Sequence, residues 1–244
     1  MSETARTKLG HGLSKPVGRA RLRLGALRFS MAQFLIALVL LFATEPFVEQ
    51  FGYGKAIEAV LLTLVLLSAV PAIGGGGRTL IWAIVLVIPA IVGKWANYVS
   101  SGRIAPEAGL VPSLVFVLFV VFHLLRFILR APRVNSEVLC AGISTYLMLG
   151  LIWTFAYILV ARMVPNSFAF TSGQASGQSM VGFNALYFSL ITLTTVGYGG
   201  IVPASPVARM LAMTEAMTGT IYVAVLISRL VALHSSARAS DERR

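Results

Sequence analysis

Residues 193–200 read LTTVGYGG, and this stretch decides how the rest of the chain is interpreted. A second Gly-Tyr-Gly occurs at residues 52–54, in EQFGYGK, where neither threonines nor a short apolar segment precede it. Its surroundings predict only a tight turn in a loop. The copy at residues 197–199 is different because it follows VGFNALYFSLITL, residues 181–193.

This mostly apolar segment of 13 residues is too short to cross a membrane as a helix. At about 1.5 Å per residue they reach roughly 20 Å, whereas a hydrocarbon core is about 30 Å thick. A polar, Gly- and Ser-rich stretch precedes them at residues 165–180, and IVPASP follows at residues 201–206. The pattern predicts a re-entrant half-helix that returns as extended backbone. Such backbone is tolerated at membrane depth where it lines a water-filled path or is buried in protein.

The composition is that of an integral membrane protein. Hydrophobic residues make up 57% of the 244, and only 12% are charged, about half the share typical of soluble domains. We therefore predict an all-α membrane fold with six transmembrane helices, the re-entrant segment lying between the fifth and sixth. The predicted spans are residues 29–44, 56–73, 79–95, 110–129, 138–161 and 206–233.

The distribution of Lys and Arg orients these spans. With both termini in the cytoplasm, fifteen basic residues lie on the inner side and five on the outer side, as the positive-inside rule expects. The net charge of +11 is explained by such flanks, so nucleic acid is not expected as a partner. The basic segment 1–28 is expected either to lie on anionic lipid or to be a simple inside-positive flank.

Enzymatic and metal-centre chemistry finds no support in the sequence. Cys140 is the single cysteine, and the three histidines are far apart with no ligand spacing. The sequence contains no G-x-S-x-G or H-E-x-x-H motif. A transporter with broken helices would normally show its re-entrant feature twice, and here it occurs once. We expect a protein that is not an enzyme and has no catalytic residues and no cofactor.

The stretch 195–199, TVGYG, resembles the selectivity filter of potassium channels of the tetrameric P-loop family, in its prokaryotic six-span form. Thr194 doubles the threonine, and a pore-helix-like segment precedes the motif. The resemblance implies a homotetramer in the cytoplasmic membrane that passes K⁺ passively. It also implies that K⁺, as the permeant ion, would be held by the backbone carbonyls of Thr195, Val196, Gly197 and Tyr198 and by the Thr195 hydroxyl, with Gly199 completing the filter.

Further positions follow from the last predicted span. Gly219 lies where the family usually places a gating hinge, although a small residue there also suits helix packing. Thr220, Val223 and Ile227 are candidates for the inner cavity by helical spacing. Thr194 and Glu215 are candidate filter supports. Glu215 is expected to brace the pore helix at Ser189 or Thr192 or to attract cations near the cavity; the alternative is an acid of the outer leaflet paired with Arg209 of this or a neighbouring chain.

Two features leave the type of channel open. Gly200 stands where most family members have Asp, which keeps a non-selective cation channel as an alternative. The fourth span lacks the arginine ladder of a voltage sensor, because Arg126, Arg130 and Arg133 lie at its cytoplasmic end. We therefore expect weak or no voltage dependence, the alternative being a degenerate sensor built on Arg126, Arg130 and His123.

The predicted organisation has four parts. Residues 1–28 form the basic cytoplasmic segment, and residues 29–133 form a four-helix membrane domain in the position of a voltage sensor. Residues 134–233 form the pore domain, with an outer helix, pore helix, filter and inner helix. Residues 234–244 form a short cytoplasmic tail.

Overall fold

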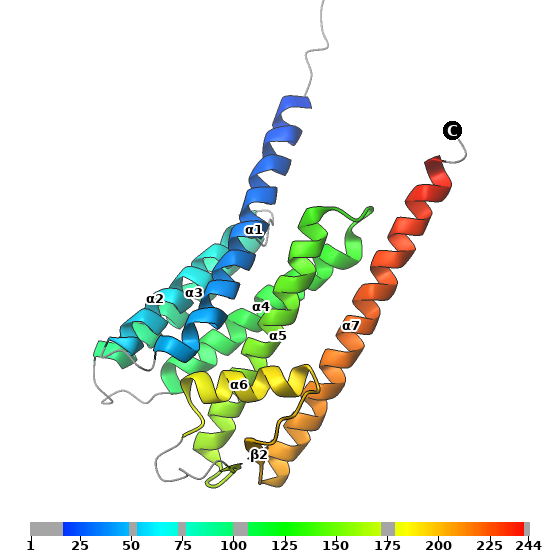
Figure 1. The fold of residues 1–244 in the computed structure, drawn as a ribbon. Coiled ribbons are helices and arrows are strands. Elements are labelled where there is room, and N and C mark those ends of the chain that lie inside the picture. The colour runs from blue at the N-terminus through cyan, green and yellow to red at the C-terminus, as the bar shows by residue number, and fades with distance from the viewer. Residues whose placement is uncertain (1–16, 49–52, 73–76, 100–106, 172–178, 242–244) are drawn as a thin grey trace, which may run out of the picture.

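The computed structural model describes residues 17–48, 53–72, 77–99, 107–171 and 179–241. Within them the chain is mostly helical (Figure 1). The elements in order are α1 (Val17–Val48), α2 (Gly54–Ala72), α3 (Gly77–Val99), α4 (Glu107–Arg130), α5 (Ser136–Met163), β1 (Phe168–Phe170), α6 (Gly182–Leu193), β2 (Ile201–Pro203) and α7 (Pro206–Asp241).

Four of these helices are long and apolar enough to cross a membrane. The qualifying segments are Arg78–Ala96, Gly109–Arg130, Ser136–Met163 and Pro206–Leu233. Met31–Phe47 and Ala56–Ala72 are shorter apolar helices. Figure 1 shows that α1 begins and α7 ends at the same end of the molecule. The apolar segments fall where the sequence predicts them, and the chain is a membrane protein with at least four helices suited to spanning.

Two helices extend beyond their predicted spans. α1 begins at Val17, well before residue 29, and α7 continues to Asp241, past residue 233. The apolar composition marks where lipid contact is expected, whereas Arg, Leu and Ala in the flanks are good helix formers in water. The rest of the predicted basic segment, residues 1–16, lies outside the described residues.

The first four helices pack through small residues. Ala69 and Ala90 are fully buried, and a Cβ added to Gly109 on α4 would lie 2.8 Å from the carbonyl carbon of Gly93 on α3. Close backbone approach of this kind is typical of helix packing in lipid. Lys94 Nζ and Glu58 Oε1 form an ion pair of 2.5 Å between α3 and α2. The apolar core continues without a break into α5, through Val138, Met148 and Phe155.

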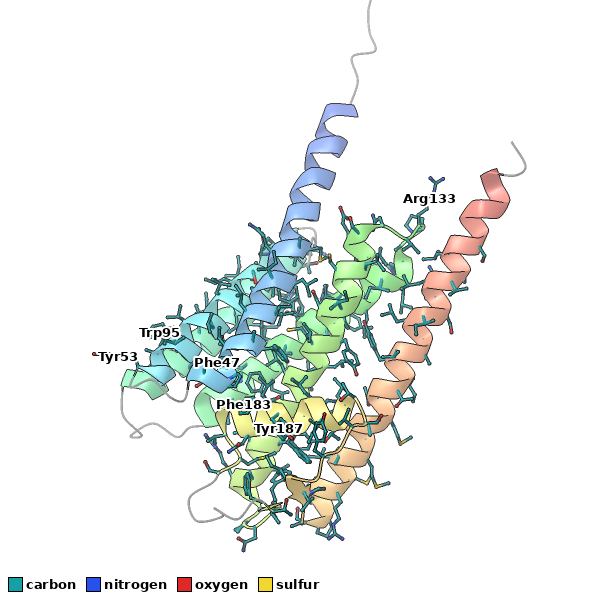
Figure 2. All side chains as sticks on the ribbon, viewed as in Figure 1. Phe47, Tyr53, Trp95, Arg133, Phe183 and Tyr187 are labelled. Atoms are coloured by element: carbon teal, nitrogen blue, oxygen red, sulfur yellow. The ribbon has the colours of Figure 1, made fainter. Side chains whose placement is uncertain are left out.

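The connection between α4 and α5 is short and is bound to the last helix. Residues 131–135 separate the two helices, and the Asn135 side chain caps α5 by accepting from the Val138 amide at 3.0 Å. Arg229 of α7 donates from Nη2 to the carbonyl oxygens of Leu129 and Ala131, at 3.0 and 3.2 Å. The end of α4 is thus hydrogen-bonded to α7. Figure 2 places Arg133 at the end of the molecule where α7 ends, and Tyr53 at the opposite end.

Candidate functional site: the loop between α6 and β2

The TVGYG stretch follows helix α6, which lies between α5 and α7 in the chain. This helix has 12 residues, Gly182–Leu193, and lies crosswise to α5 and α7 (Figure 1), in agreement with the predicted half-helix at residues 181–193. Carbonyl oxygens in the last turn of α6 accept hydrogen bonds from the loop that follows. The Val196 and Gly197 amides both donate to the Ile191 carbonyl oxygen, at 2.9 and 3.1 Å, and the Thr195 amide donates to Thr192 O at 2.9 Å.

The backbone of the loop alternates in handedness. Thr195, Gly197 and Gly199 have φ values of +59°, +56° and +80°, and the intervening Val196 and Tyr198 are not at positive φ. Thr195 is strained in this region, because a β-branched residue rarely adopts positive φ. An alternation of left- and right-handed residues turns successive peptide groups the same way, so their carbonyls can form one row.

These carbonyls have no partner among the described residues. No N–H or O–H donor in that part of the chain binds the carbonyl oxygens of residues 195–198. The side chains beside them are exposed, Val196 by 52% and Tyr198 by 75%. Backbone carbonyl oxygens require a partner, and a dehydrated cation is a partner that such a row of oxygens can bind. The structure thus places four adjacent acceptors of the predicted filter where a ligand can reach them.

Hydrogen bonds from Thr171 hold the C-terminal end of the loop. β1 pairs antiparallel with β2, with Phe170 opposite Ile201. Directly after β1, the Thr171 hydroxyl donates to Gly199 O at 2.6 Å and lies 3.1 Å from Gly200 O, to which the Thr171 amide also donates. Gly200 has open space beside it. Thr171 therefore holds the backbone at Gly200, the position where the sequence analysis noted the absence of Asp. The sequence analysis did not identify Thr171.

The Thr171 contact predicts a stabilising role at the outer mouth. In Thr171→Val the hydroxyl is lost at nearly constant volume, which removes about 1 kcal/mol of net hydrogen bonding. For a potassium channel of the kind that the sequence resembles, we expect the lifetime of the conducting state in bilayers to fall roughly fivefold. Thr171→Ser keeps the hydroxyl and is the matched control. Equal lifetimes in the Val variant and the parent protein would contradict a role for this bond.

Glu215 lies behind α6 and is fully buried. Ser189 Oγ of α6 is 2.6 Å from Glu215 Oε1, and the Tyr157 hydroxyl of α5 donates to Glu215 Oε2. Of the partners considered for Glu215, the structure shows Ser189 and neither Thr192 nor Arg209. Arg209 is exposed and donates from Nε to Pro203 O at 3.2 Å. Glu215 thus joins three helices, and Tyr157 is a member of the cluster that the sequence analysis missed.

Tyr157 also begins an aromatic cluster on the outer side of α6. Its ring meets Phe188 and Phe168 edge-on, with centroids 4.8 and 5.7 Å apart, and those two rings lie 5.5 Å from each other. Edge-to-face pairs of this kind stabilise packing beyond the area they bury. The cluster connects α5, β1 and α6, so the strand that directly precedes Thr171 is fixed to the helix that precedes the loop.

Gly219 lies where α7 crosses the end of α6. A Cβ added there would be 2.2 Å from the Leu193 carbonyl oxygen, so only glycine fits. The Tyr146 hydroxyl donates to the same carbonyl at 3.3 Å, and its ring stacks on Tyr222, whose hydroxyl donates to Gly142 O at 2.7 Å. The structure therefore shows packing at Gly219, one of the two roles considered for it. A hinge there stays a prediction.

The remaining predicted site residues make local contacts. Thr194 Oγ1 donates to Leu190 O at 2.7 Å, within the turn that ends α6. Thr220 Oγ1 donates to Ala216 O at 2.9 Å. Val223 and Ile227 are exposed in the single chain. An inner cavity formed by these residues stays a prediction, because it needs neighbouring subunits.

The comparison with known proteins agrees with this geometry. Residues 145–235 match a family described as "Ion channel", a range that covers most of α5, the loop and most of α7. Together with the apolar helices, this match defines an ion-channel domain in a membrane protein.

The similar proteins include several potassium channels. Two-pore potassium channel 1 of Arabidopsis thaliana is 46% identical over 57 residues, covering 23% of this chain and 16% of that protein. Two-pore potassium channel 4 of the same plant is 32% identical over 88 residues, covering 36% and 30%. A voltage-gated potassium channel of Aeropyrum pernix is 40% identical over 45 residues, covering 18% and 15%. The chain thus spans less than a third of the length of these relatives. Each match therefore covers only part of a potassium channel.

Proposed function

We propose that this protein is a potassium-selective channel that conducts K⁺ passively across the cytoplasmic membrane. The observation that carries the proposal is the row of unpartnered carbonyls at residues 195–198, held in alternating backbone conformation at the end of α6. Rings of such carbonyls replace the hydration shell of K⁺ in potassium channels. Val196 and Tyr198 then point away from the ions, and Tyr198 packs against neighbouring pore helices.

The proposed assembly is a homotetramer of six-span subunits. One row of carbonyls cannot surround an ion, and potassium channels combine four such loops. α7 supports the assembly because it presents a large unburied apolar surface. Along this helix the exposed side chains include Met210, Met213, Met217, Ile221 and Val225. Contact with neighbouring subunits would bury this surface, and the Thr220, Val223 and Ile227 positions would then line the inner cavity.

We also propose weak voltage dependence. Arg126 and Arg130 are exposed near the end of α4, where long side chains reach the interface. His123 Nδ1 lies 2.9 Å from Phe119 O within the same helix, and the ring contacts Phe119 and Phe122. A steep conductance–voltage curve in planar bilayers would contradict this proposal and favour the degenerate sensor.

The reversal potential tests the selectivity. The purified protein is reconstituted in bilayers with K⁺ on one side and Na⁺ on the other, and uptake of Rb⁺ into liposomes detects even rare openings. We expect a potential near the K⁺ equilibrium value. A potential near zero with measurable current would mean a non-selective cation channel, the alternative that Gly200 keeps open. Liposomes that take up neither Rb⁺ nor Na⁺ would contradict the channel proposal.

A further inference from the structure

The polar cluster around Glu215 contains more close contacts than an ionised carboxylate can satisfy. Three oxygen–oxygen contacts run in series. Gly150 O lies 2.8 Å from Ser189 Oγ, Ser189 Oγ lies 2.6 Å from Glu215 Oε1, and Glu215 Oε2 contacts the Tyr157 hydroxyl. Each contact at such a distance needs one proton between its two oxygens. Three protons are therefore required.

The hydroxyl groups supply only two of them. Tyr157 provides the proton on its own contact, and Ser189 has a single hydroxyl proton. The Gly150 carbonyl can only accept, so the contact at 2.8 Å uses the Ser189 proton. The contact between Ser189 and Glu215 is then left with two oxygen lone pairs facing each other, unless Glu215 itself carries a proton on Oε1.

The surroundings of Glu215 also disfavour a charge. Glu215 is fully buried within a helix suited to spanning the membrane. Among the residues that the structure describes, no basic side chain pairs with it; the described ion pair joins Lys94 to Glu58. An unpaired carboxylate at that depth is costly. A neutral acid that accepts from Tyr157 and donates to Ser189 satisfies every contact.

We propose that Glu215 is a protonated carboxylic acid that donates its proton to Ser189, and that this bond positions α6 and thereby the TVGYG loop. The inference deepens the proposed channel function and rests on it for the role of the loop, but the protonation stands on the geometry alone. Ser189 lies one turn before Leu193, where α6 ends. A shift of Ser189 therefore moves the carbonyl of Ile191, to which the Val196 and Gly197 amides are bound.

Infrared spectroscopy of the reconstituted full-length protein tests the protonation without any channel activity. The difference spectrum between the parent protein and Glu215→Gln at neutral pH should contain the carbonyl stretch of a protonated carboxyl group. Carboxylate bands in its place would overturn the proposal. If Glu215→Gln does not fold, the difference spectrum is taken between the parent protein and Tyr157→Phe. Loss of the bond from Tyr157 should move the same carbonyl band to higher frequency, and an unmoved band would overturn the proposal.

Rb⁺ flux tests the positioning. The glutamine amide accepts through oxygen and donates through nitrogen, so Glu215→Gln should keep the flux within about twofold of the parent, whereas Glu215→Ala and Ser189→Ala should lose about tenfold. If Glu215→Gln lowers the Rb⁺ flux as much as Glu215→Ala does, and the two variants have equal thermal stability, the proposal of a proton-donating acid is contradicted. If the parent protein itself passes no ions, the channel proposal fails while the infrared result still decides the protonation.

Discussion

Gly197→Ala is expected to abolish the preference for K⁺ over Na⁺ and to move the reversal potential to zero. Gly197 has φ of +56° and open space beside it, so the added methyl group meets no atom of its own chain. The effect comes from the backbone alone, since alanine in the left-handed region costs roughly 1–2 kcal/mol. In a tetramer this cost recurs in every subunit. The strain can be relieved only if the backbone leaves the left-handed region, which rotates the row of carbonyls.

Gly200→Ala is the matched control for this experiment. Gly200 has equally open space, but its φ is not in the left-handed region. The two variants therefore add the same group and differ only in backbone conformation. We expect Gly200→Ala to keep the reversal potential of the parent protein. Loss of selectivity in both variants, or in neither, would contradict a filter that depends on alternating handedness.

Gly219→Ala is expected to lower the thermal stability of the assembled protein and to remove most of its ion flux. The added Cβ would lie 2.2 Å from the Leu193 carbonyl oxygen, a backbone atom that cannot move aside alone. Overpacking of this kind costs about 1–3 kcal/mol, more than the gain of roughly 1 kcal/mol from replacing a helical glycine by alanine. The displaced group is the end of α6, so the loop should be disturbed as well.

Gly142→Ala on α5 gives the comparison. Its Cβ would meet the methyl groups of Leu226 at 3.2 and 3.3 Å, the flexible end of a side chain, so a small change in melting temperature is expected. The two substitutions carry the same gain in helix propensity. If Gly219→Ala instead assembles with unchanged melting temperature and alters only the open probability, Gly219 acts as a hinge rather than as a packing site.

The sequence was informative where structure is encoded locally. The short apolar segment, the paired threonines and the two glycines predict a half-helix followed by non-helical backbone, and α6 and the positive φ values at Gly197 and Gly199 confirm it. The apolar runs likewise predict the long helices. The helices α1 and α7 run beyond the predicted spans because hydropathy reports contact with lipid, whereas helix formation continues in polar sequence when the residues favour it.

The supports of the loop could not be found in the same way. Tyr157 meets Glu215 from 58 residues away, and Thr171 reaches Gly199 across 28 residues, so no local pattern indicates either contact. Arg209 of the same chain does not pair with Glu215, for a geometric reason. Residues six apart are about 120° around a helix from each other, and Arg209 faces outward while Glu215 faces α6.

The short link at residues 131–135 has a consequence for how subunits come together. Five residues allow at most about 20 Å between the ends of α4 and α5, and the apolar core runs unbroken from α1 and α4 into α5. In the proposed tetramer each chain would therefore keep its helices α1 to α4 against its own α5 and exchange none with a neighbour. A newly made subunit could then fold this part of its structure before it meets another. Assembly of the proposed tetramer would consist of folded subunits docking around an axis. Protease resistance of α4 and α5 in unassembled subunits, equal to that in the assembled protein, would demonstrate this order of events.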